Sequence, residues 1–276
     1  MQSSSAEPAE LVDFLTEVRA QEGTPSAPAA CLNCGAVWSG AYCATCGQER
    51  VGRITLGSFA HEVTGQLVEV DRGLLHTFIA MLRRPGAMIR EYLQGRRREY
   101  TSPVTFVLIA SGLSLLRGAL TPDASRQLAS LQTANDATYR LVYSAAQLDV
   151  FHRISDLITT NKFAMDTFLL VPMVLALRFL FRKRGFNLAE IGVFVFYTIG
   201  QATLLSVVIG TPLMLVASAK FESGLFIIAS IGYLLYAGLG VFGRSFGTAM
   251  RLLGSAVLGL ILMDGVAFLI PFVVAR

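Results

Sequence analysis

Long apolar stretches occur in the second part of this chain, where they predict membrane-spanning helices. Five of them follow residue 101, at 103–120, 164–181, 188–218, 224–242 and 252–274. A helix needs about 20 apolar residues to cross the hydrocarbon core of a bilayer, so we predict about five transmembrane helices. Thr101 or Ser102 before Pro103 predicts the start of the first span, and Asn187-x-x-Glu190 predicts a capping box at the third.

Residues 49–100 also repeat apolar side chains at helical spacing, but in stripes too short to cross a bilayer. The stripes are Phe59, Val63, Leu67, Val70 and then Leu74, Leu75, Phe78, Ile79, Leu82, with a third helix beginning at Pro85. The polar sides carry Arg83, Arg84, Arg90, Arg96, Arg97 and Arg98. Such helices suit the headgroup plane of a membrane, where each cation near an anionic leaflet is worth about 1 kcal/mol. We therefore predict basic, lipid-binding juxtamembrane helices.

Two further segments are polar. Residues 1–30 form a tail in which Leu11, Phe14, Leu15 and Val18 predict a short amphipathic helix before a linker rich in Gly, Pro, Ala and Ser. In the loop at 121–163, another amphipathic helix is predicted by Leu148, Phe151, Ile154 and Ile158. The tail lacks the basic and apolar regions of a signal peptide, so we expect the first apolar helix to direct insertion.

Residues 31–48, CLNCGAVWSGAYCATCGQ, contain the four cysteines of the chain in two Cys-x-x-Cys-Gly knuckles. A glycine after each pair permits the tight turn that points both thiolates at one ion. Four thiolates favour Zn²⁺, with iron as the alternative. The knuckles are closer than the usual spacing of about 15–20 residues, which predicts a minimal ribbon folded by its metal, worth about 10–16 kcal/mol. The predicted ligands of this structural zinc are Cys31, Cys34, Cys43 and Cys46.

Two other uses of the cysteines fit the sequence less well than metal binding. A pair of disulfides requires an oxidising compartment, and a thioredoxin-like redox site requires a βαβ setting that the pattern does not show. Trp38 and Tyr42 lie between the knuckles and are expected to cover the metal or to contact a partner.

The composition agrees with a membrane protein, because 53% of the residues are hydrophobic and only 15% are charged. Soluble domains have about 45–50% apolar and about 25% charged residues. The predicted fold class is an all-α polytopic membrane protein with a small N-terminal zinc ribbon and amphipathic juxtamembrane helices. Its predicted parts are the tail at 1–30, the ribbon at 31–48, the basic helices at 49–100 and the transmembrane bundle at 101–276.

The distribution of basic residues predicts the orientation. Segments 82–100, 182–190 and 243–251, on one side of the five-span arrangement, contain eleven Lys and Arg, and the opposite side contains six. The positive-inside rule then places the N-terminus in the cytoplasm and the C-terminus in the periplasm of a bacterial inner membrane. Reduced, metal-binding cysteines fit the same orientation.

Several motifs together resemble a known family. They are the knuckles ending in CGQ, then Arg-Ile-Thr-Leu, DRGLL and RRPGAMIREYLQGRRREYTSP. Over about residues 31–110 the chain resembles the bacterial membrane family catalogued as domain of unknown function 3667. The resemblance implies a zinc ribbon, a helix pair and several spans. Because that family has no assigned activity, it implies no reaction and no site beyond the cysteines.

Two polar residues stand out because they lie deep within predicted spans. Asp264 lies near the middle of the fifth span, where a carboxylate costs about 2.5–3.5 kcal/mol on insertion scales. It should therefore face the bundle, either protonated or paired, and Gln201 in the third span is the first candidate partner. The pair could form a hydrogen bond that fixes helix packing, or a proton or ion site.

The sequence predicts no enzyme, because His61, His76 and His152 are scattered and a four-Cys metal site leaves no open position for water. The leading hypothesis is an adaptor or scaffold that presents its cytoplasmic ribbon to a protein partner or to anionic lipid headgroups. The alternative is a transporter or channel subunit that uses Asp264 and Gln201, with a lipid-modifying enzyme third. Nucleic acid is not expected as a partner, because the basic residues lie where the membrane already is.

Overall fold

The computed structural model describes residues 29–49, 54–55, 57, 73–120, 140–160, 162–214 and 219–274. Within these ranges the side chains at 29, 118–120, 154–160, 162–169, 214, 219–224, 264 and 267 are outside the description. The predicted tail helix at 11–18 and the apolar stripe at 59–70 also lie outside the described residues.

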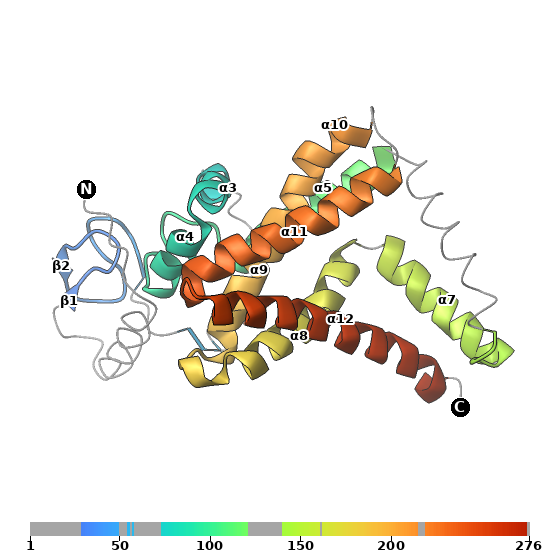
Figure 1. The fold of residues 1–276 in the computed structure, drawn as a ribbon. Helices are drawn as coiled ribbons and strands as arrows, with labels where there is room; N and C mark the ends of the chain where they lie inside the picture. The colour runs from blue at the N-terminus through green and yellow to red at the C-terminus, as the bar shows by residue number, and fades with distance from the viewer. Residues whose placement is uncertain are drawn as a thin grey trace.

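The ribbon precedes the helices and contains a short hairpin. Strands β1 (Ala29–Ala30) and β2 (Val37–Trp38) pair antiparallel, with Ala30 opposite Val37. An isolated bridge joins Tyr42 to Glu49. So little regular structure cannot enclose an apolar core of its own, and the ribbon lies beside the helical part at one end of the molecule (Figure 1).

Helices α3 (Gly73–Arg83) and α4 (Pro85–Leu93) form the predicted helix pair. Pro85 occupies the first turn of α4, where its missing N–H costs nothing. The apolar face of α4 is buried, and α4 packs against α11 (Ala219–Phe242). The hydroxyls of Tyr233 and Tyr236 on α11 donate to the carbonyls of Met81 and Arg83, at 3.0 and 2.6 Å. These bonds satisfy carbonyls that the end of α3 leaves without helical partners.

The remaining helices form the bundle shown in Figure 1. They are α5 (Pro103–Leu120), α7 (Ala145–Thr160), α8 (Lys162–Leu180), α9 (Leu188–Leu205), α10 (Thr211–Met214), α11 and α12 (Phe246–Val274). Helix α9 is largely buried between its neighbours, including α5 and α8. Helix α12 packs along α8 and α7. At the end of α11, the ring of Phe242 packs against those of Phe181 and Phe194, with centroids 4.5 and 5.0 Å apart.

Local signals in the sequence correspond to the observed helix starts. Asn187 caps α9 through the predicted box, because its side chain accepts from the Glu190 N–H at 2.9 Å and its own N–H donates to Glu190 Oε2 at 2.8 Å. At α5, Ser102 Oγ accepts from the Thr105 N–H at 3.3 Å. Before Pro212, residues Ser206–Gly210 form a π-helical turn, because proline lacks an N–H and clashes with the preceding turn.

Three of the described helices are long and apolar enough to cross a membrane, namely Leu188–Leu213, Leu225–Phe242 and Phe246–Val274. They coincide with the predicted third, fourth and fifth spans. Helices α5 and α8 occupy the first and second predicted spans, but their described apolar parts, Pro103–Arg117 and Leu170–Leu180, are shorter. The protein is therefore mostly helical and compatible with a membrane, whereas the count of five spans stays a prediction.

Candidate metal centre and the basic end of the bundle

Each cysteine pair lies on a turn of the same construction. In the first knuckle the N–H of Gly35 donates to the carbonyl of Cys31, and in the second the N–H of Gly47 donates to that of Cys43, both at 2.8 Å. Gly35 and Gly47 have φ angles of 77° and 72°. This left-handed conformation is open to glycine and strained for most other residues, which explains the glycine after each pair.

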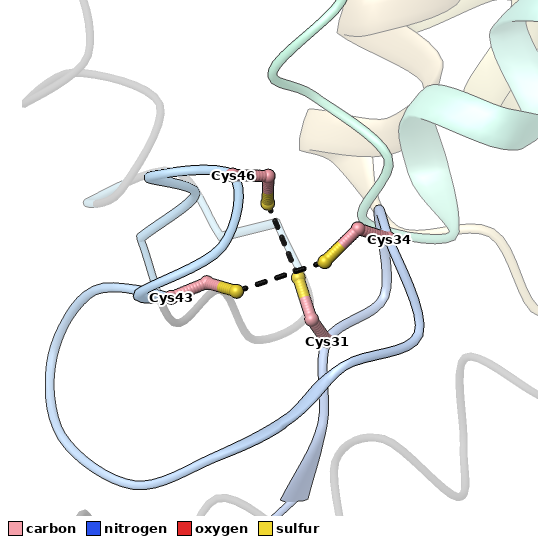
Figure 2. Close-up of side chains that lie close together, drawn as sticks. All are labelled: Cys31, Cys34, Cys43 and Cys46. Atoms are coloured by element: carbon pink, nitrogen blue, oxygen red, sulfur yellow. Dashed lines mark hydrogen bonds between the residues drawn. The ribbon is translucent and has the colours of Figure 1, made fainter.

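The two turns bring the four sulfur atoms together, and Figure 2 shows the side chains converging on one point. All four sulfurs lie within 4.8 Å of one another, with Cys31–Cys46 at 3.6 Å and Cys34–Cys43 at 3.7 Å. Four thiolates about 2.3 Å from a tetrahedral zinc ion would lie about 3.8 Å apart. The predicted residues therefore form a cluster with the dimensions of a four-thiolate metal site.

The protein environment affects the thiols unequally. Hydrogen bonds from the backbone N–H of Cys46 and then of Thr45 help to lower the pKa of Cys43 to about 6. The backbone N–H of Ala36 lowers the pKa of Cys34, but desolvation and hydrogen bonds with the other three thiols outweigh it and raise that pKa to about 12. A bound cation would favour the thiolate form of every ligand, because it replaces repulsion among four sulfurs with attraction.

Hydrogen bonds of the Gln48 side chain join the second knuckle to the loop that follows α4. Its buried side chain donates from Nε2 to the carbonyl of Gly95 at 2.7 Å. Its Oε1 accepts from the N–H groups of Arg97 and Arg98 at 3.3 and 3.4 Å. Sequence reasoning did not single out Gln48 as a docking residue, because its partners are backbone groups. The only signal was that Gln48 ends the CGQ motif, while its partners lie in the GRRR stretch at 95–98 of the other motif.

The arginines predicted to bind lipid have several different environments around that loop. Arg84 and Arg96 pair with Glu91, and Tyr100 donates to the same carboxylate at 2.6 Å. The guanidinium of Arg97 lies 5.6 Å from the centre of the Tyr92 ring. Arg83 and Arg98 are exposed. Burial, followed by the nearby charge of Arg244, lowers the pKa of Arg90. Lipid binding by these six residues stays a prediction.

Basic segments that are distant in sequence meet at this end of the bundle. Arg184 Nη1 donates to the carbonyl of Phe242 at 3.1 Å, and Arg90 is close enough to Arg244 for the two charges to interact. Asn187 Nδ2 donates to the carbonyl of Ile54 at 2.8 Å. The three segments that the sequence placed on one side, 82–100, 182–190 and 243–251, are therefore neighbours beside the ribbon (Figure 1). We call them the basic end.

The predicted intramembrane pair is only half described. Gln201 is fully buried, and its Nε2 donates to the carbonyl of Phe78 on α3 at 3.4 Å. Among the described residues, its Oε1 has no hydrogen-bond partner. Asp264 belongs to α12, but its side chain is outside the description, so the proposed pairing with Gln201 stays a prediction.

One family comparison covers part of this region. Residues 71–115 match the model described as Protein of unknown function (DUF3667). The matched segment contains α3, α4, the arginine-rich loop and most of α5, so the resemblance seen in the DRGLL and RRPG motifs is confirmed there. The ribbon lies outside it. No curated protein and no solved structure matches the chain.

Proposed function

We propose that the protein is a multi-pass inner-membrane adaptor whose zinc-bound ribbon binds a protein partner in the cytoplasm. The exposed apolar surface of the ribbon carries this proposal. Val37 and Tyr42 are 75% and 64% exposed although they lie between the metal knuckles. A metal-fixed loop that presents an aromatic and an aliphatic side chain is pre-organised for binding. Gln48 holds this surface on the membrane part of the chain.

Zinc is the proposed ion, with a structural role. Four thiolates at the observed spacing suit a tetrahedral ion. Such a site has no open coordination position, so the ion would hold the ribbon rather than activate water. We accordingly propose binding and no enzymatic reaction for the ribbon.

A photo-crosslinking amino acid placed at Val37 or Tyr42 in living cells tests the adaptor. We expect a discrete crosslinked partner from both positions and none of the same mass from Leu141, which is 86% exposed on a different part of the chain. Tyr42→Ala should weaken binding of that partner about 30-fold, the effect of losing one aromatic anchor worth about 2 kcal/mol. Unchanged crosslinking from Val37 in a Cys34→Ser/Cys46→Ser chain would contradict a role for the folded ribbon.

The proposed orientation has the ribbon and basic end in the cytoplasm, supported by the eleven Lys and Arg of the three basic segments. Reporter fusions test it. A fluorescent protein at the N-terminus should mature in the cytoplasm, and alkaline phosphatase fused after Arg140 should be active in the periplasm. The one predicted span before residue 140 is α5. An inactive phosphatase at this position would therefore contradict the prediction of five spans, and α9, α11 and α12 would remain as the spanning helices.

A further inference from the structure

A cleft of about 250 Å³ lies where the end of α8 meets the start of α12. We propose that it binds the phosphate headgroup of an anionic phospholipid. The residues that line it are Phe179, Leu180, Arg182, Lys183, Arg184 and Arg251. Sites for whole drug-sized ligands occupy about 300–1,000 Å³, so this cleft fits a headgroup rather than an entire lipid. The inference rests on the membrane location and is independent of the adaptor role.

The charge of the cleft favours an anion. Four of its six lining residues are cationic, and no ion pair joins any of these four to a carboxylate of the described residues. Contacts restrain the positions of two of them. Arg184 donates to the carbonyl of Phe242, and the guanidinium of Arg182 lies 5.5 Å from the centre of the Phe179 ring. Arginine groups held in this way suit a phosphate, which accepts several charge-assisted hydrogen bonds.

Positive charge continues beyond the cleft. Arg244 lies in the turn between α11 and α12, and its charge helps to lower the pKa of Arg90. The three segments of the basic end contain eleven Lys and Arg against three carboxylates, those of Glu91, Glu99 and Glu190, so their own acidic residues do not neutralise the positive charge. An anion from outside the chain would relieve the resulting repulsion.

An apolar stripe leads away from the cleft along α8 and identifies the anion as lipid. Val171, Leu175 and Phe179 recur every four residues, so they lie on one face of the helix. They are 55%, 51% and 61% exposed. Because α8 occupies the second predicted span, acyl chains would cover this stripe, which favours a lipid phosphate over free phosphate or an acidic peptide in the cleft. The acyl chain of a phospholipid can lie along the stripe while the phosphate reaches the cations, which places the basic end at the headgroup level.

The first test measures binding of phosphatidylglycerol to the purified full-length chain in detergent, with net-neutral phosphatidylcholine as the reference lipid. Replacing two interfacial cations in Arg182→Gln/Arg251→Gln should weaken phosphatidylglycerol binding about 30-fold. The matched control is Arg140→Gln/Arg153→Gln, which removes two exposed cations outside the cleft and should leave affinity unchanged. An equal loss of phosphatidylglycerol affinity in both variants would show a general effect of positive charge and would contradict the proposed site.

A second test uses the unsubstituted chain and does not depend on whether variants fold. Phosphatidylglycerol with a photoreactive group on its acyl chain, incorporated in nanodiscs, should label peptides containing Val171–Phe179 in preference to other exposed helix faces. Even labelling of all lipid-facing helices would overturn the proposal. So would inorganic phosphate that displaces the lipid at equal concentration, since this would indicate an anion site that does not recognise the acyl chain.

Discussion

Replacing Cys34 and Cys46 with serine is expected to unfold residues 29–49 and leave the helical bundle assembled. The double variant removes one thiolate from each knuckle. Besides the cysteines, the described ribbon has a two-residue strand pair, one isolated bridge and the Gln48 contacts, so a bound metal would supply most of its folding free energy, about 10–16 kcal/mol in modules of this size. Helix packing around Phe181 and Phe242 does not involve these cysteines and should persist.

Hydrogen exchange read by mass spectrometry checks this result. The amides of Cys31, Gly35, Cys43 and Gly47 donate to carbonyls within the knuckles, so they should exchange slowly in the unaltered chain and rapidly in the double variant. Ser39→Ala, at an exposed position between the knuckles, is the matched control and should keep the slow exchange. Protected knuckle amides in the double variant would show that something other than the metal folds the ribbon.

Adding one methyl group at Gly240 is expected to separate α4 from α11 and destabilise the bundle. A Cβ atom at Gly240 would lie 2.7 Å from the Cα of Gly86, and a Cβ at Gly86 would clash with the backbone of Gly240 in turn. Backbone atoms cannot move aside as a flexible side chain can, so we expect Gly240→Ala to cost about 1–3 kcal/mol or more. Small residues allow this kind of close helix contact in membranes.

Gly232→Ala on the same helix is the control, because a Cβ there meets nothing within 4 Å. In a helix interior alanine is favoured over glycine by up to about 1 kcal/mol, so this change should be neutral or stabilising. Thermal unfolding of both variants in one detergent measures the difference. A transition temperature for Gly240→Ala equal to that of Gly232→Ala would show that α4 and α11 are not in backbone contact.

Features that depend on neighbouring residues could be predicted from the sequence. The Asn187–Glu190 capping box and the Ser102 cap each use residues three apart. The cysteine cluster likewise follows from two local turns, because each Cys-x-x-Cys-Gly segment points its own thiols in one direction. In all three cases the chemistry is complete within a few residues, so no knowledge of the fold was needed.

Contacts between distant segments were not visible in the same way. The apolar face of α4 was interpreted as lipid-facing, but Met88, Ile89 and Tyr92 pack inside the protein. Lipid tails and protein interiors are equally apolar, so an amphipathic pattern cannot distinguish them. The approach of Gly86 to Gly240 depends on how α4 and α11 pack.

The cationic cleft and the contact between the ribbon and the bundle also depend on distant segments and could not be predicted from the sequence. Arg182, Lys183 and Arg184 were used only as part of the basic segment 182–190 that predicts the orientation. Arg251 joins them because α12 packs along α8. The docking role of Gln48 was not predicted, because its side chain forms hydrogen bonds with backbone groups of Gly95, Arg97 and Arg98. Backbone groups are the same in every sequence, so the side-chain pattern does not reveal such a contact. Side-chain pattern alone therefore indicated the type of protein and its metal ligands, but not the surfaces that join its parts.

Native mass spectrometry of the full-length chain, released from membranes without added metal, tests the central claim most directly. The account predicts one zinc ion per chain and four reduced cysteines, since the sulfurs of Cys31, Cys34, Cys43 and Cys46 lie at the spacing of a single tetrahedral site. A mass equal to the metal-free chain, or one lighter by the four hydrogens lost in forming two disulfides, would contradict it.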